Sequence, residues 1–261
     1  MENPRKYGEQ PYRLVLVHGG PGAAGELEPR CNLLSAQMGV LEPLQTADTL
    51  PGQVGELEEL ITREGDPPFI IVGWSWGAWL GYILAASRPD IVSQLIMVGA
   101  APFEQRYVGR MNETRMSRLS GEELRSLASI VPSMRDSPNP SDDLRRTARI
   151  IKRADSYDLI PHRNPDIIYD AEIHRSVWRD GESMRRSGKL LSLGREIECP
   201  VVAVHGDHDP HPAEGVEEPL TGIIDDFHLI TLERCGHYPW YEKHARDRFV
   251  SLLEDLIRNS I

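Results

Sequence analysis

The sequence predicts an α/β domain with a mostly parallel sheet covered by helices on both faces. Short apolar runs typical of buried strands alternate with longer helix-like segments, which is the pattern of parallel strands joined by crossover helices. Two of these runs end directly in glycine-rich turns. Strand-like runs stop between residues 101 and 198 and then resume, which indicates a helical insertion within one domain.

The strands and core helices follow from the periodicity of the apolar residues. The last helix has the clearest pattern, because Phe249, Leu252, Leu253 and Leu256 recur at helical spacing among charged residues. We expect strands at 13–17, 38–41, 69–73, 94–99, 201–205 and 227–232, and helices at 53–64, 76–87 and 241–258.

The strand at 69–73 runs into Gly73-Trp74-Ser75-Trp76-Gly77 and then into a helix. A strand, G-x-S-x-G and a helix in this order form a nucleophile elbow, a turn that exposes its serine at the tip. The turn is so tight that β-carbons two residues to either side of the serine would collide with the neighbouring strand and helix, which explains the two glycines. Ser75 is therefore the candidate nucleophile.

Two further regions provide the candidate oxyanion-binding loop, acid and histidine that an exposed serine needs for catalysis. The segment His18-Gly19-Gly20-Pro21-Gly22 follows the first strand, and its glycines let a backbone N–H approach a negatively charged oxygen closely. The segments 205–210 and 235–240 each follow a late strand. They place an acid and then a histidine downstream of Ser75, in the order of a Ser, Asp, His triad.

From about residue 12 to residue 249 the sequence resembles the α/β-hydrolase family. HGGPG, GWSWG, the G-x-x-D spacing that ends at Asp209, and GHYPW around His237 stand in the order of that family. The resemblance implies Ser75 as nucleophile, His237 as general base and then acid, and Asp209 as the carboxylate that orients the histidine. It also implies that Gly20 and Trp76 supply the N–H groups of an oxyanion hole, with no cofactor and no metal.

Asp207 is the nearest rival for the acid. The strand before it is expected to end at Gly206, and the family spacing places the acid three residues later, which favours Asp209. His18 opens the glycine loop, and we expect it to hold that loop by hydrogen bonds rather than to react.

Residues 101–198 are the expected insertion, between core segments 1–100 and 199–261. In the fold that the resemblance implies, such an insertion lies over the carboxyl edge of the sheet and selects the substrate. We expect its helices at 120–130, 141–154, 165–173 and around 177–184, with N-terminal caps at Ser120 and Ser141.

The glycine loop and the elbow also resemble those of the proline iminopeptidase branch, which holds a free amine with acids of the insertion. Glu104, Glu172 and Glu182 are the candidates, although acids are mostly solvated surface residues. The chain is short for that branch, and carboxylesterases, lactonases and carbon–carbon bond hydrolases of the family have a similar loop and elbow. The favoured function is hydrolysis of a small ester or amide, with carboxylesterase first and aminopeptidase second.

Two other functions stay open. Imidazoles and carboxylates together can bind zinc, although the spacing here does not match H-E-x-x-H. The residues in question are His205, Asp207, His208, Asp209 and His211. The fold can also serve a binder or receptor with negligible turnover, but a complete triad and oxyanion loop favour an enzyme.

Composition argues against some classes of binding partner and predicts the cellular compartment. A net charge of −11 argues against nucleic acid or an anionic membrane as the main partner, so a small ester or amide is the expected one. The first six residues lack the apolar core of a signal peptide and no segment has the length of a membrane span, which predicts a cytoplasmic protein. Cys31, Cys199 and Cys235 lack the close pairing of a zinc or redox motif and are expected to be reduced packing thiols.

Overall fold

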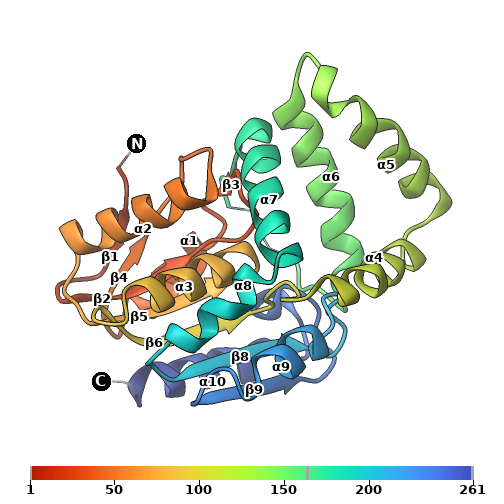
Figure 1. The fold of residues 1–261 in the computed structure, drawn as a ribbon. Coiled ribbons are helices and arrows are strands. Elements are labelled where there is room, and N and C mark those ends of the chain that lie inside the picture. The colour runs from red at the N-terminus through yellow and green to blue at the C-terminus, as the bar shows by residue number, and fades with distance from the viewer. Residues whose placement is uncertain (1, 163–164, 260–261) are drawn as a thin grey trace.

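The computed structural model describes residues 2–162 and 165–259, and it has a seven-stranded sheet at its centre (Figure 1). The order of the strands is β1-β4-β2-β5-β6-β8-β9. Strand β1 pairs antiparallel with β4, and the other neighbours pair in parallel, which confirms the predicted mostly parallel sheet. The strands are β1 (Arg5–Tyr7), β2 (Tyr12–Val17), β4 (Gly39–Glu42), β5 (Phe69–Trp74), β6 (Val92–Val98), β8 (Val201–Gly206) and β9 (Phe227–Leu232).

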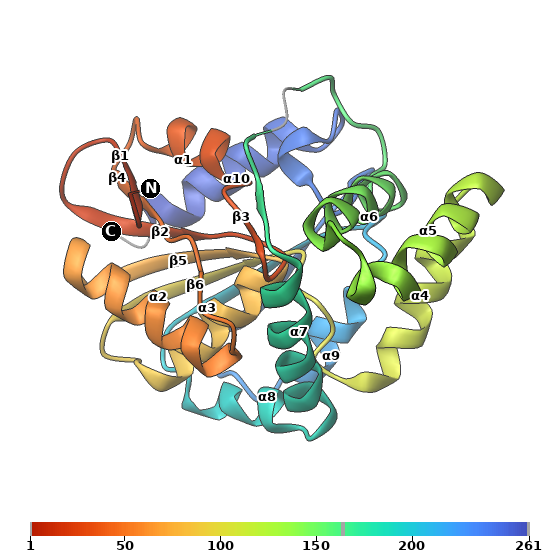
Figure 2. The same cartoon turned by 90° about the horizontal axis from the view of Figure 1, so that it is seen from above.

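Helices cover both faces of this sheet, as predicted. Helices α2 (Leu50–Glu64) and α3 (Trp76–Ser87) lie on one face, and α1 (Glu28–Leu34) and α10 (Arg246–Arg258) lie on the other (Figure 2). Two further elements, α9 (Glu214–Leu220) and the 3-10 turn η4 (Pro239–Tyr241), belong to the C-terminal part. None of the helices in the described ranges combines the length and the apolar character needed to cross a membrane.

Each face of the sheet has its own apolar cluster. Ile71 of β5 packs with the cluster of α2 and α3, whereas its neighbour Ile70 packs with the cluster of α1 and α10. Successive side chains of a strand point to opposite faces, so a strand covered on both faces must be apolar throughout. The three cysteines are buried within these two apolar clusters, as expected for packing residues.

The chain between β6 and β8 is mostly helical. Helices α4 to α7, called the inserted helices below, gather beyond one edge of the sheet (Figure 1), while Leu191 of α8 accepts a hydrogen bond from Tyr82 of α3. The elements of this stretch are η1 (Gln105–Tyr107), α4 (Val108–Ser117), α5 (Gly121–Ser133), η2 (Met134–Asp136), α6 (Pro140–Ala154), α7 (Ala171–Arg186), α8 (Lys189–Ser192) and η3 (Leu193–Glu196).

The helix predicted at 165–173 is wrong. Residues Ile168–Tyr169 form a short strand, β7, which pairs antiparallel with β3 (Ala23–Ala24) near the glycine loop. Helix α7 begins only after Asp170, whose carboxylate accepts hydrogen bonds of 2.9 Å from two N–H groups of the first turn. The pairing with β3 is a contact between segments far apart in the sequence, so local periodicity does not reveal it.

Several helix starts differ in detail from the predictions; α2, for example, begins at Leu50 rather than at 53. Ser120 caps α5 in a capping box with Glu123, as predicted. Ser141 does not cap α6, which begins one residue earlier at Pro140, and its hydroxyl instead accepts a hydrogen bond of 3.3 Å from the N–H of Ala171. The last helix begins at Arg246 rather than at 241, because the turn η4 precedes it.

Candidate active site

Ser75 occupies the turn between β5 and α3. Its φ and ψ are 54° and −111°, and its N–H donates a hydrogen bond of 2.8 Å to the carbonyl oxygen of Val98. A positive φ is rare for a residue with a side chain and is tolerated only where the surroundings enforce it. The neighbouring strand and the helix therefore hold Ser75 in a strained conformation at the end of β5.

The two glycines of the elbow are required by close backbone contacts. A β-carbon on Gly73 would lie 2.2 Å from the carbonyl oxygen of Gly77. One on Gly77 would lie 2.1 Å from the carbonyl oxygen of Val17. These distances are far below any van der Waals contact, so the sequence-based explanation of the glycines is confirmed.

The glycine loop after β2 lies beside this turn. Gly20 and Gly22 have φ of 54° and 70°, in the left-handed region that favours glycine. A β-carbon on Gly22 would also come within 2.1 Å of the carbonyl oxygen of Asp170, where α7 begins. The loop is thus fitted between the sheet and the inserted helices.

His18 holds the loop in place, as expected. It is completely buried; one ring nitrogen lies 2.8 Å from the carbonyl oxygen of Gly19, and the other accepts a hydrogen bond of 3.3 Å from the N–H of Gln45. Burial lowers the pKa of His18 to about 4, so the ring is neutral at pH 7. Both ring nitrogens are occupied by the backbone, which leaves neither for chemistry.

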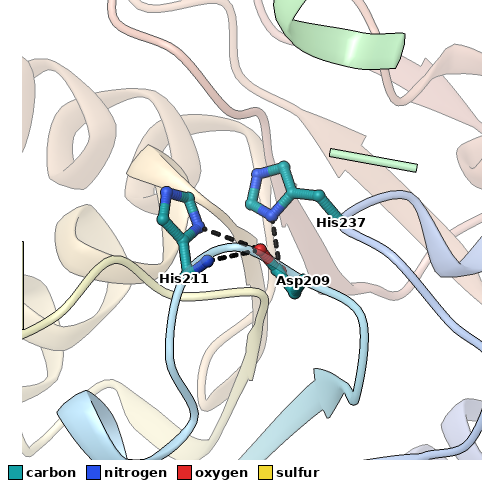
Figure 3. A group of neighbouring side chains, drawn as sticks. All are labelled: Asp209, His211 and His237. Carbon is teal, nitrogen blue, oxygen red and sulfur yellow. Dashed lines mark hydrogen bonds and ion pairs between the residues drawn. The ribbon is translucent and has the colours of Figure 1, made fainter. Parts of the chain in front are cut away.

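Asp209 and His237 meet at the ends of β8 and β9. Nδ1 of His237 lies 2.7 Å from Oδ2 of Asp209, and both side chains are buried (Figure 3). Asp207, the rival acid, is exposed and accepts a hydrogen bond of 3.1 Å from the N–H of Cys235. The tight turn after Gly206 therefore brings Asp209, and not Asp207, to the histidine.

Charge and burial shift the pKa values of Asp209 and His237 in opposite directions. Burial alone would raise the pKa of Asp209, but the charges on His237 and His211 and the hydrogen bond from His237 hold it well below its usual range. Burial alone would lower the pKa of His237, but the charge of Asp209 and the hydrogen bond to it raise that pKa above its ordinary value. An ionised carboxylate beside the ring therefore stabilises the imidazolium form.

His211 is a third member of this group. Its backbone N–H donates a hydrogen bond of 2.9 Å to Oδ1 of Asp209, and its Nδ1 lies 3.5 Å from the same oxygen (Figure 3). The rings of His211 and His237 are edge to face, with centroids 4.5 Å apart. Sequence reasoning considered His211 only as a possible metal ligand, and no local signal indicates that it contacts the acid.

The five residues considered as metal ligands do not lie together in the structure. Asp209 and His211 come together with His237, and their candidate ligand atoms lie within 4.8 Å of one another. Asp207 is turned to solvent and His208 packs edge-on against Tyr157. His205 is buried within β8.

A cavity of about 980 Å³ lies between the sheet edge and the inserted helices. From the core, the glycine loop, the elbow and the histidine contribute Gly20, Ser75, Trp76, His211 and His237 to its wall. The inserted helices α4, α6 and α7 contribute the opposite wall. The predicted nucleophile, base and oxyanion donors thus all border one cavity.

Trp76 is the first residue of α3, and the N–H groups of a first helical turn have no acceptor within the helix. The helix dipole adds positive potential at this end. Trp76 and Gly20 both line the cavity beside Ser75. These residues are placed where N–H groups could face a negatively charged oxygen.

The three acids considered for binding an amine are either paired with an arginine or outside the cavity. Glu104 pairs with Arg106 at 2.8 Å. Glu172 is exposed in the first turn of α7, and Glu182 lines the cavity but lies 3.7 Å from the guanidinium of Arg185. The structure therefore gives none of them the role of an unpaired acid in the cavity.

The loop that carries His237 is supported by buried groups that sequence reasoning missed. Glu242 is completely buried, and its carboxylate accepts hydrogen bonds from the N–H groups of Gly236, Tyr157 and Asp158 at 2.8 to 2.9 Å. Indole Nε1 of Trp74 donates a hydrogen bond of 3.0 Å to the carbonyl oxygen of His237. The loop is thus fixed to the elbow strand and to the chain that follows α6.

The chain belongs to the alpha/beta hydrolase family. The sequence profile of that family matches residues 14–252. A "Probable proline iminopeptidase" of Streptomyces coelicolor is 27% identical over 130 residues, which are 50% of this chain and 38% of the relative. "Lipase LipV" of Mycobacterium tuberculosis is 38% identical over 53 residues, which are 20% of each chain. The chain thus matches well under two thirds of either relative.

Solved structures confirm the fold. The crystal structure of VinJ superposes with a TM-score of 0.68 at 19% identity, covering 98% of this chain and 94% of the other. At such low identity the likeness concerns the fold and not the substrate.

Proposed function

We propose that the protein is a serine hydrolase of small esters, with Ser75, His237 and Asp209 as its catalytic triad. The observation that carries the proposal is the buried hydrogen bond of 2.7 Å between His237 and Asp209, at the wall of the cavity that Ser75 also lines. A serine hydroxyl needs an imidazole to take its proton, and the imidazole needs a fixed carboxylate to hold its tautomer.

The reaction proceeds through an acyl-enzyme. His237 takes the proton of Ser75 through Nε2 as the serine oxygen attacks the carbonyl carbon, and the carbonyl oxygen becomes an oxyanion held by the N–H groups of Gly20 and Trp76. His237 then gives the proton to the leaving alcohol as the C–O bond breaks. Water, deprotonated by His237, attacks the acyl-enzyme, and the acid leaves as Ser75 recovers its proton.

Asp209 supports both steps electrostatically. Its Oδ2 accepts a hydrogen bond from the Nδ1–H of His237, which leaves Nε2 of that ring without a proton and available as the base. The charge of Asp209 stabilises the imidazolium that forms at each attack. Burial of the pair strengthens this interaction, because the local dielectric is lower than that of water.

We further propose that residues 101–198 act as a cap that selects the substrate, over a catalytic core of residues 1–100 and 199–261. The inserted helices form one wall of the cavity, while the proposed catalytic groups lie on the other. Walls contributed by loops and insertions usually determine specificity on a rigid scaffold.

An ester substrate is favoured over an N-terminal proline. The match to the iminopeptidase relative covers half of this chain, which keeps aminopeptidase activity as the second candidate. That activity requires an acid to hold the free amine, and the predicted acids are paired or outside the cavity. The match to a lipase, although short, agrees with an ester.

The proposal is tested by turnover of p-nitrophenyl butyrate and of proline p-nitroanilide, with Ser75→Ala as the matched variant. We expect faster cleavage of the ester, and loss of that activity in the variant. Preference for the prolyl amide would favour the aminopeptidase. Equal rates in native protein and variant would exclude Ser75 as the nucleophile, and no turnover beside tight ligand binding would favour a binder or receptor.

A metal-dependent reaction is a separate alternative, since Asp209, His211 and His237 could each offer one ligand atom. The hydrogen bond between Nδ1 of His237 and Asp209 leaves only Nε2 of that ring for a metal, and Nε2 is the proposed base. We expect the rate of p-nitrophenyl butyrate cleavage to be unchanged by EDTA. Loss of activity with EDTA and its recovery with Zn²⁺ would favour the metal.

A further inference from the structure

Arg185 is a buried cation in the wall of the active-site cavity. It lies in the last turn of α7, and only 3% of its surface is exposed. Arginine is almost never buried without partners that compensate its charge. The surroundings of Arg185 therefore indicate what it is placed to bind.

The polar partners of Arg185 satisfy only part of its guanidinium. Its Nε donates a hydrogen bond of 3.3 Å to Oε1 of Gln105, and its Nη2 lies 3.7 Å from Oε1 of Glu182. Its Nη1 is buried and has no hydrogen-bond partner among the described residues. Burial lowers the pKa of Arg185, yet a guanidinium stays protonated at pH 7. Two N–H bonds of a charged group are thus available.

Arg185 also lies near the elbow. Its guanidinium carbon is 5.5 Å from the centre of the Trp79 ring, in the geometry of a cation–π contact. Trp79 is one helical turn after Trp76, the residue next to Ser75, and the two indole rings are 5.9 Å apart. The charge therefore lies against a buried aromatic pair, Trp79 and Trp76, of which Trp76 adjoins the proposed nucleophile.

Among the described residues of the cavity wall, Glu182 is the acid that pairs with Arg185, at 3.7 Å and without a hydrogen bond. Two of the other cations of the wall are matched by acids of the wall: Arg115 pairs with Asp155 at 2.7 Å and Lys152 with Glu26 at 3.6 Å. Glu182, beside Arg185, is 36% exposed at its side chain and is too far for a hydrogen bond. A protein with a net charge of −11 thus places an incompletely compensated cation inside its cavity.

We propose that Arg185 binds a carboxylate of the substrate, so that the preferred substrates are esters that carry an additional acid group. This inference rests on the proposed serine hydrolase. A substrate carboxylate can accept a charge-assisted hydrogen bond from Nη1, the guanidinium nitrogen that has no partner among the described residues. A positively charged amine, which an aminopeptidase must hold, would be repelled at this position.

The test compares acids with their methyl esters, so that only the charge changes. Mono-p-nitrophenyl adipate and methyl p-nitrophenyl adipate differ in charge on the acyl side. The butyrate esters of 4-hydroxybenzoic acid and of methyl 4-hydroxybenzoate differ in charge on the alcohol side. The ratio of kcat/KM, acid over methyl ester, is measured for each pair, with Ser75→Ala as the blank.

We expect the native protein to prefer the acid in one of the two pairs, and that pair identifies the side of the substrate that Arg185 contacts. Arg185→Gln should lower this ratio by roughly 10- to 100-fold, as expected for loss of a hydrogen bond between charged groups. Arg185→Lys, which keeps the charge, should retain part of the preference. Arg186→Gln removes an exposed cation from the same helix turn and should leave the ratio unchanged.

A ratio at or below one in both pairs for the native protein would overturn the inference, and this outcome does not depend on how any variant folds. An unchanged ratio in Arg185→Gln, in protein with native circular dichroism, would also overturn it. Either result would leave the proposed hydrolase intact as long as Ser75→Ala abolishes cleavage. Equal cleavage by native protein and Ser75→Ala would instead refute the proposed function itself.

Discussion

The backbone N–H of His237 donates a hydrogen bond of 2.8 Å to the carbonyl oxygen of Asp155, the residue that ends helix α6. The carboxylate of the same Asp155 is buried and accepts two hydrogen bonds of 2.7 Å from Arg115 of α4. The proposed base is therefore held from the insertion as well as from the core.

We expect Asp155→Asn to destabilise the protein by about 3 kcal/mol, because it leaves the half-buried guanidinium of Arg115 without its counter-charge. Urea unfolding measures the change. Glu214→Gln is the matched control. It removes the carboxylate that pairs at 3.5 Å with Arg110, an exposed residue on the same helix as Arg115. Exposed pairs contribute less than about 1 kcal/mol, so equal effects of the two variants would contradict the prediction.

Asp209→Asn should reduce kcat for p-nitrophenyl butyrate by about 10⁴, because the amide no longer fixes the tautomer of His237. Asp207→Asn should keep activity within about tenfold of the native value, since Asp207 contacts the N–H of Cys235 and not the histidine. Loss of turnover in Asp207→Asn alone would show that the acid is wrongly assigned.

The pH dependence of kcat/KM should reflect His237. The proposed base acts only when it is neutral, and Asp209 raises its pKa against the opposing effect of burial. Activity should therefore rise with pH through a midpoint above about 6.5, the ordinary value for histidine. In Asp209→Asn the raising effect is lost while burial remains, so the midpoint should move to lower pH. A native midpoint below 6.5 would contradict the assignment of His237 as the base.

Alanine substitutions at two glycines should have opposite effects on stability. Gly77→Ala places a β-carbon 2.1 Å from a backbone oxygen of β2, and we expect a loss of at least about 3 kcal/mol. Gly55 lies exposed inside α2, and a β-carbon there would meet nothing within 4 Å, so Gly55→Ala should gain about 0.5–1 kcal/mol. Thermal unfolding measures both, and a tolerated Gly77→Ala would refute the explanation of the elbow.

The sequence predicted those parts of the fold and the site that depend on local contacts. The close approach of Gly73 to Gly77, the turn from Gly206 to Asp209 and the capping box at Ser120 involve residues close in the chain. Their residue types therefore carry the information. The apolar runs predicted the strands of the sheet, because strands covered on both faces must be apolar.

The parts that sequence reasoning missed depend on distant contacts. The pairing of β3 with β7 joins segments more than 140 residues apart, and Arg115 meets Asp155 across 40 residues. The contact of His211 with Asp209 depends on how the loop after β8 turns, although the two residues are close in sequence. None of these contacts follows from the type or spacing of the residues alone.

The three hydrogen bonds that Glu242 accepts have a consequence for how specificity can change in this protein. They join the loop of His237 to residues 157 and 158, which directly follow α6. Tyr157 and Asp158 lie within residues 101–198, so exchange of this segment for that of a relative would also alter two of the three groups that hold the loop of His237. Single substitutions on the cavity wall leave these hydrogen bonds intact, so they can test the proposed role of residues 101–198 without disturbing the proposed base.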